Sequence, residues 1–176
     1  MLGSTPYENI VYAKNTAIDF VNNFDNEYTN LSIYGDSGVG KTFLSNCIAK
    51  ELIDSSHSVI YLSATRLFDM LADETFNKSY SDDKTSNFKL TSYLYDCDLL
   101  IIDDLGTELI NSFTTSELFT CINERNLNRK STIISSNLSL MDLEKFYSER
   151  IFSRLTTYKL LKIIGDDLRI KISLSS

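Results

Sequence analysis

The chain has 176 residues, 43% of them hydrophobic and 23% charged, which is the size and composition of one ordinary globular domain. These values exclude a fibrous, low-complexity or wholly disordered chain, and the longest apolar stretches are far too short to cross a membrane. Seventeen Lys and Arg against twenty-four Asp and Glu give a formal net charge of −7, which excludes a generally basic nucleic-acid-binding surface.

The cysteines and the single histidine offer little chemistry. Cys47, Cys97 and Cys121 are isolated and never spaced as C-x-x-C, so we expect reduced, mostly buried thiols. No signal-peptide pattern opens the sequence, and we therefore expect a cytoplasmic protein. His57 lies in a polar stretch with few partners for a metal site or a Ser-His-Asp triad, so we expect it in a surface loop.

Short β-rich runs alternate with amphipathic stretches, and this predicts a parallel sheet with crossover helices. Strands are expected at residues 31–34, 58–63, 99–102, 132–135 and 159–164. Helices are expected at residues 13–24, 41–53, 66–71, near 88–95, from 114 onward, and at 139–146 and 149–158. Thr114 and Glu117 are expected to form a capping box, Ser139 to cap the following helix, and residues 73–87 to form a polar loop or insertion.

Half of the six glycines fall within six positions, between a predicted strand and a predicted helix. Residues 35–42 read GDSGVGKT, which is G-x-x-x-x-G-K-[ST] in the context that this motif requires. A polyphosphate needs several converging backbone N–H groups, which favours glycine, and the helix N-terminus adds its dipole. We expect Lys41 to contact the outer phosphates and Thr42 to ligate Mg²⁺.

The apolar strand at residues 99–102 ends in two acids, Asp103 and Asp104. Such a strand delivers both carboxylates to the C-terminal edge of the sheet, where open α/β folds bind their ligands. We expect Asp103 in the Mg²⁺ shell, usually through water, and Asp104 beside the water that attacks the γ-phosphate.

These motifs resemble those of the AAA+ ATPases and, within them, the bacterial replicative helicase loaders of the DnaC/DnaI kind, over nearly the whole chain. GDSGVGKT resembles the Walker A motif of that family, and LLIIDDLGTE resembles its Walker B motif. The resemblance implies an α/β P-loop NTPase fold of the AAA+ type, with a parallel five-stranded sheet flanked by helices, and ATP and Mg²⁺ as cofactors. The implied nucleotide contacts are Gly35, Asp36, Ser37, Gly38, Val39, Gly40, Lys41, Thr42 and Phe43.

The resemblance also assigns roles to polar residues later in the chain. Asn137 stands where the family's sensor I residue orients the attacking water. The segment SERIFSRL resembles the arginine-finger segment, in which Arg154 is the better candidate to reach a neighbouring subunit's γ-phosphate. GDDLR resembles the sensor II region, with Arg169 reaching the nucleotide in the same chain. The residues alone also allow Asn137 to be a turn former, and they allow Arg150 and Arg154 to be solvated helix charges.

Three departures from the family pattern bear on this interpretation. Asp104 is one methylene shorter than the usual Glu, which makes Glu108 an alternative acid for positioning the water. Loaders carry an N-terminal helicase-binding domain, and we expect it to be absent from this chain, so that residues 1–176 form one AAA+ ATPase domain. Seven residues follow Arg169, so we expect the family's helical lid to be minimal or missing.

The resemblance implies an ATPase that is slow as a monomer and assembles with copies of itself through nucleotide-bridged interfaces. It would place a hexameric replicative helicase on single-stranded DNA, with no membrane involved. Strand-binding residues would lie within 65–96, where the candidates are Lys78, Tyr80, Lys84 and Lys89. Acids outnumber bases in that segment, which favours a plain solvated insertion.

Other functions remain open. An IstB-like transposition helper ATPase shares the double Asp, although its duplex binding calls for a more basic chain. A small P-loop kinase and a nucleotide-holding adaptor without useful hydrolysis are further alternatives. Strand order separates the kinase, because an AAA+ sheet inserts the strand before Asn137 between the P-loop strand and the Asp103 strand, whereas the kinase pairs those two directly.

Overall fold

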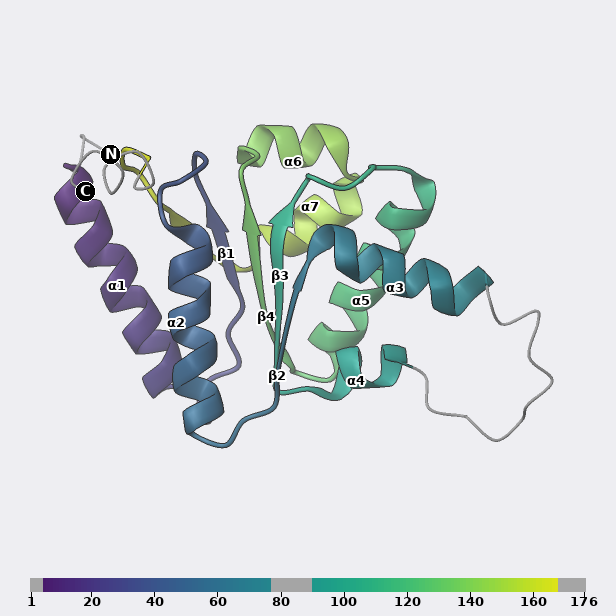
Figure 1. The fold of residues 1–176 in the computed structure, drawn as a ribbon, viewed down its shortest axis with the longest axis horizontal. Helices are drawn as coiled ribbons and strands as arrows, with labels where there is room; N and C mark the ends of the chain where they lie inside the picture. Colours follow the sequence, from purple (N-terminus) through teal and green to yellow (C-terminus); the bar gives the residue numbers. More distant parts are fainter. Residues whose placement is uncertain (1–4, 77–89, 168–176) are drawn as a thin grey trace, which may run out of the picture.

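The computed structural model describes residues 5–76 and 90–167 (Figure 1). Its centre is a parallel sheet with the strand order β2-β3-β4-β1-β5. The strands are β1 (Leu31–Tyr34), β2 (Val59–Ser63), β3 (Leu99–Leu105), β4 (Ser131–Ser136) and β5 (Lys159–Lys162). The expected five-stranded parallel sheet is confirmed. Because β4 lies between β1 and β3, the order is the one that the AAA+ resemblance implies and differs from that of the kinase alternative.

Helices cover both faces of the sheet (Figure 1). One face carries α1 (Pro6–Asn22) and α2 (Lys41–Asp54). The other carries α3 (Ala64–Phe76), α4 (Leu90–Asp96), α5 (Ser112–Leu127), α6 (Leu140–Phe146) and α7 (Glu149–Leu155). Neighbouring residues of β3 alternate between these cores: Ile101 packs toward α1 and α2, and Ile102 toward the other helices. Burial on both sides explains the continuous apolar run at residues 99–102.

Local capping explains two differences from the sequence prediction. Helix α1 begins seven residues earlier than expected, because Pro6 occupies its first turn and Thr5 forms a capping box with Glu8. Helix α5 is capped by Asn111, and Thr114 is the third helical residue of that box. The predicted box from Thr114 and Glu117 is therefore wrong, whereas the predicted cap of α6 by Ser139 is confirmed.

Other differences lie at element ends. Helix α3 continues to Phe76, into the segment expected to be a loop, and α7 ends at Leu155, three residues before its predicted end. Strand β3 continues through both acids to Leu105. Cys97 and Cys121 are buried as expected, but Cys47 is exposed. Among the described residues, no helix is long and apolar enough to span a membrane.

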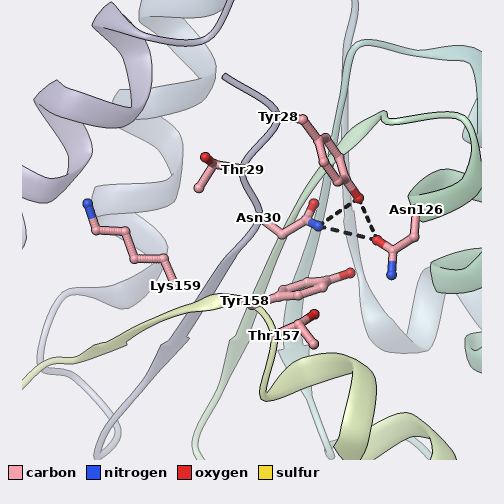
Figure 2. A pocket seen from close by; sticks show the side chains of 7 residues that line it. All are labelled: Tyr28, Thr29, Asn30, Asn126, Thr157, Tyr158 and Lys159. Carbon is pink, nitrogen blue, oxygen red and sulfur yellow. Dashed lines mark hydrogen bonds between the residues drawn. The ribbon is translucent and has the colours of Figure 1, made fainter. Parts of the chain in front are cut away.

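A network of polar side chains lies at the edge of the sheet where the parallel strands begin (Figure 2). The Asn30 amide donates to the Tyr28 hydroxyl at 2.9 Å, and that hydroxyl donates to the Asn126 side-chain oxygen at 2.7 Å. The Asn30 oxygen accepts from the backbone N–H of Thr132 at 2.7 Å. These bonds join the starts of β1 and β4 to the end of α5, beside a cavity of about 480 Å³.

Candidate nucleotide-binding site

The glycine-rich loop joins β1 to α2 at the C-terminal edge of the sheet (Figure 1). Gly35 has a φ of 152° and Gly38 a φ of 78°, a region that other residues rarely adopt. A Cβ at Gly35 would lie 2.2 Å from the carbonyl oxygen of Ile163, and one at Gly38 would lie 2.1 Å from the Asp167 carboxylate. Gly35 is therefore required by its backbone conformation and by the nearby Ile163 backbone, whereas Gly38 is required by its backbone conformation, because the Asp167 side chain could move aside.

The N-terminus of α2 is open for an anion. Its cap residue is Gly40, at a φ of 103°, and no side chain caps the first turn. The first N–H groups of a helix lack partners within the helix, and the helix dipole adds partial positive charge there. The loop and the helix start together form a phosphate-binding geometry.

Lys41 connects this loop to β4. Its side chain is 4% exposed, and its ammonium donates to the carbonyl oxygens of Gly35 at 2.8 Å and Asp36 at 2.7 Å. It also donates to the side-chain oxygen of Asn137 at 2.5 Å. The structure thus brings together the two residues to which the sequence assigned the outer phosphates and the attacking water.

The Asp103 carboxylate receives hydrogen bonds from three hydroxyl groups. The Thr42 hydroxyl donates to Oδ2 at 2.9 Å, the Tyr61 hydroxyl donates to the same oxygen at 2.7 Å, and the Ser135 hydroxyl donates to Oδ1. Burial, and then the bond to Asp103, raises the pKa of Tyr61 well above its usual value of 10, so this hydroxyl keeps its proton at neutral pH. Tyr61 and Ser135 were missed in the sequence, where their hydroxyls within the apolar runs VIYLS and TIISS were the available signal.

The two candidate water-positioning acids differ in their surroundings. Asp104 has a left-handed φ of 56° at a register shift between β3 and β4, and its backbone N–H donates to the Ser135 hydroxyl at 3.1 Å. Such irregularities re-aim a side chain next to active sites. Glu108 accepts from the Gly106 backbone N–H at 2.8 Å and, with its other oxygen, from the Tyr147 hydroxyl.

The bond between Tyr147 and Glu108 thus joins the loop after β3 to the C-terminal end of α6. Burial, followed by the bond to Glu108, raises the pKa of Tyr147 well above 10, so it remains a donor. Both oxygens of Glu108 are engaged, whereas among the described residues no hydrogen bond involves the Asp104 carboxylate.

Other predicted residues are exposed or lie outside the described residues. Arg154 is exposed on α7 and donates to the side-chain oxygen of Asn123 on α5 at 3.0 Å, so its described partner is not in the loop. Asp36 and Ser37 are exposed in the loop. Outside the described residues lie Arg169, Lys78, Tyr80, Lys84 and Lys89.

An apolar groove of about 620 Å³ runs between α1 and α2, beside the loop. Val39, whose side chain is buried, and Phe43, which is 71% exposed, line it from the α2 side. Ile10 lines it from α1, and Ile163 lies at the same groove. A flat apolar ring therefore has a surface to contact within reach of the phosphate-binding loop.

A protein-family model described as "IstB-like ATP binding protein" matches residues 11–175. The chain belongs to this family. It is 25% identical over 143 residues to the replicative helicase loader DnaC of Escherichia coli, covering 81% of this chain and 56% of that protein. It is 30% identical over 148 residues to a Sinorhizobium fredii protein named as an insertion sequence ATP-binding protein, y4pL, covering 81% of this chain and 57% of the other.

The fold has a close match among solved structures. Replication initiator DnaA bound to AMPPCP and single-stranded DNA superposes with a TM-score of 0.75 at 27% identity, covering 93% of this chain and 49% of that one. The chain spans about half the length of the curated relatives that it matches. The resemblance to AAA+ ATPases of the helicase-loader kind is confirmed. The family description and the insertion-sequence relative also agree with the IstB-like alternative.

Proposed function

We propose that the chain is an Mg²⁺-dependent ATPase that acts as a switch in placing a hexameric replicative helicase on single-stranded DNA. The observation that supports the proposal most is the meeting of Lys41 with Asn137, and of Thr42 with Asp103, at one edge of the sheet. A phosphate cradle, a magnesium ligand pair and a polar group for water are thereby gathered from α2, β3 and β4. Phosphoryl transfer needs little more from a protein than such positioning and charge neutralisation.

In this proposal the phosphates of ATP bind to the loop amides and the N-terminus of α2. Lys41 already donates to two loop carbonyls and to Asn137, so an incoming phosphate must replace at least one of these acceptors. The adenine ring packs in the groove between α1 and α2, against Val39 and the exposed ring of Phe43. Because Lys41 also contacts Asn137, ATP binding would link the outer phosphates to the end of β4.

The donor set at Thr42 and Asp103 fits Mg²⁺, a hard cation that takes oxygen ligands. The Thr42 hydroxyl donates a hydrogen bond to Asp103, which leaves the lone pairs of the Thr42 oxygen available to a metal. Thr42 would ligate the ion directly and Asp103 through water. When bound, Mg²⁺ would neutralise charge on the β- and γ-phosphate oxygens.

Asp104 would position the attacking water in preference to Glu108. Its carboxylate has no described hydrogen bond, whereas both oxygens of Glu108 are bonded to Gly106 and Tyr147. An acid that must accept a proton or orient water needs a free oxygen within reach of that water. Asn137, which accepts a hydrogen bond from the Lys41 ammonium, would help to orient the same water.

Arg154 would complete the site of a neighbouring copy. It is exposed on α7, on the face of the sheet opposite α2, and its described hydrogen bond goes to Asn123 of α5. An arginine supplied by another subunit can raise the rate of phosphoryl transfer by roughly 10³–10⁵. The monomer should therefore hydrolyse ATP slowly, and self-association should accelerate it.

A second candidate partner follows from the comparisons. The relative named as an insertion sequence ATP-binding protein is 30% identical, against 25% for the helicase loader, and both are covered to a similar extent. A transposase is thus the alternative cargo. The net charge of −7 argues against a chain that grips duplex DNA by itself, and it favours a protein partner with local contact to a single strand.

Two loading assays test this proposal. The protein is mixed with ATP, Mg²⁺ and the replicative helicase of its own organism on single-stranded circular DNA, and helicase retained on the circles is counted. We expect ATP-dependent retention, and the Lys41→Ala variant should give none. Absence of retention together with ATP-dependent recruitment of the organism's insertion-sequence transposase to duplex DNA would replace the loader by the alternative.

A further inference from the structure

The side chains of Tyr61, Asp103 and Ser135 lie on one face of the sheet, the face that α2 covers. In the β2–β3 pair Tyr61 is opposite Ile101, and in the β3–β4 pair Ile133 is opposite Ile101. Residues two positions apart in a strand point to the same face, so Asp103 and Ser135 share the face of Ile101 and Ile133. That face belongs to the core of α1 and α2, which explains why Thr42 meets Asp103 from above.

Tyr61 reaches Asp103 diagonally across the strand pair. Its hydroxyl lies 2.7 Å from Oδ2, the oxygen that also accepts from Thr42 at 2.9 Å. Diagonal neighbours on one sheet face are within reach of long aromatic side chains. The ring of Tyr61 packs against the core of this face, so the strand and the ring together fix where the hydroxyl sits.

A carboxylate has about four lone-pair sites, and three hydroxyls occupy three of them on Asp103. The torsion that turns a carboxylate about its last bond is broad and is not fixed by rotamer preference. Ser135 bonds one oxygen and Tyr61 the other, which clamps the group between the two strands that flank β3. Thr42 and Tyr61 together occupy both lone-pair sites of Oδ2, so the remaining site is on Oδ1, and the Thr42 hydroxyl stays in contact with the oriented carboxylate.

We propose that Tyr61 is a positioning residue, whose hydroxyl orients the Asp103 carboxylate so that this group and the Thr42 oxygen face the same magnesium ion. Tyr61 touches neither the nucleotide nor the reacting atoms; it acts through Asp103. This inference rests on the proposed ATPase function and adds a residue from β2 to a site otherwise built from α2, β3 and β4. Removing such an outer partner typically lowers metal affinity by roughly 10- to 100-fold.

The test compares nucleotide binding with and without the metal. A fluorescent ATP analogue is titrated into wild type and Tyr61→Phe, first in EDTA and then across a Mg²⁺ series. Phenylalanine keeps the buried ring and removes only the hydroxyl. We expect the Mg²⁺ concentration for half-maximal enhancement of binding to rise roughly 10-fold or more, with affinity in EDTA unchanged.

Tyr28→Phe is the matched control, because its hydroxyl is also hydrogen-bonded, at 2.7 Å to Asn126, but lies at the opposite edge of the sheet. It should match wild type in both series. Two results would overturn the positioning role but not the proposed ATPase function: a Tyr61→Phe protein with the wild-type Mg²⁺ midpoint, or one that loses as much affinity in EDTA as it loses in Mg²⁺. A wild-type protein whose nucleotide binding ignores Mg²⁺ would overturn the proposed ATPase site and this inference with it.

Discussion

The ammonium of Lys41 donates a hydrogen bond to the side-chain oxygen of Asn137, a residue 96 positions further along the chain. The contact exists because β4 is inserted next to β1, so the end of β4 lies beside the start of α2. In the proposed function, a phosphate that binds Lys41 would compete with Asn137, the first residue after β4 on the way to α6, for the same ammonium group.

Lys41 and Asn137 should separate binding from turnover. Replacing Lys41 by Ala removes charge-assisted hydrogen bonds to phosphate, and we expect nucleotide affinity to fall roughly 10- to 150-fold. Asn137→Ala leaves the cradle intact, so affinity should stay near wild type while phosphate release falls roughly 100-fold. Asn128→Ala, an exposed asparagine at the end of α5, is the control for fluorescence titration and phosphate release. Equal affinities for wild type and Lys41→Ala would refute the cradle.

Asp104 and Glu108 should differ in the same assays. Asp104→Asn keeps the shape of the side chain but removes its basicity, so we expect unchanged affinity for ATP with Mg²⁺ and a turnover lowered roughly 10²- to 10⁴-fold. Glu108→Gln can still accept from the Gly106 N–H and should leave turnover close to that of wild type. Single-turnover phosphate release at saturating ATP measures both. The reverse pattern would assign the water to Glu108.

The sequence predicted most of the fold because its signals were local and mutually consistent. The glycines at 35, 38 and 40, the apolar run before Asp103 and the cap at Ser139 each indicated the local structure that is observed. The helix starts were harder. Only the later part of α1 has an inward apolar stripe, because Tyr7 and Ile10 are exposed, so periodicity placed the start of the helix too late.

The site was predictable only in part, for a different reason. Tyr61 and Ser135 act through contacts across strands, and such contacts depend on strand order and register, which one sequence does not display. The bond between Tyr147 and Glu108 likewise joins segments 39 positions apart. Motif residues could be named in advance because their spacing along the chain is fixed by the loop itself.

Arg154 should make turnover depend on assembly. If it completes a neighbour's site, specific activity of wild type rises with protein concentration, and Arg154→Ala abolishes that rise while keeping ATP affinity. A mixture of the two variants supplies the decisive control. Lys41→Ala cannot bind phosphate normally but keeps Arg154, so adding this variant to Arg154→Ala should restore stimulated activity that neither variant has alone. Turnover that is independent of concentration and indifferent to the Arg154 substitution would exclude the role in trans.

Asp98 should give stability that is lost in acid. Its carboxylate accepts from Lys130 at 2.9 Å and from the backbone and hydroxyl of Ser58, and the Lys130 bond is the main cause that holds the pKa of Asp98 well below its usual value. A depressed pKa in the folded state stabilises the protein above the unfolded-state pKa of about 3.9, and this stability is lost as the pH falls through the folded-state pKa.

The charged side chains of this pair are about a third exposed, so solvent screening limits the effect. We expect Asp98→Asn to lower the free energy of unfolding by about 1 kcal/mol or less at pH 7, with the difference shrinking below pH ~4 and in high salt. Urea unfolding at several pH values measures it, and the exposed Asp69→Asn is the control. A difference that grows as the pH falls would contradict the assignment.

Arg125 should be the largest single polar contribution to stability. It is fully buried, and its guanidinium donates to the backbone oxygens of Leu94, Cys97 and Ser131 and to the hydroxyl of Thr132. It thus holds the end of α4 and the starts of β3 and β4 against α5. The planar fork of five donors suits these divergent acceptors, whereas a lysine ammonium supplies three donors from one point.

Arg125→Met keeps much of the volume and leaves several buried carbonyl groups without a donor. Because several hydrogen bonds from a charged group are lost together, we expect the free energy of unfolding to fall by at least about 3 kcal/mol, and Arg125→Lys to recover only part of it. Arg129→Met, four residues later and exposed, loses only the contact of its guanidinium with the Tyr28 ring and should change it by about 1 kcal/mol or less. Urea midpoints for Arg125→Met and Arg129→Met that coincide would show that buried apolar contact, and not the guanidinium, holds these strands together.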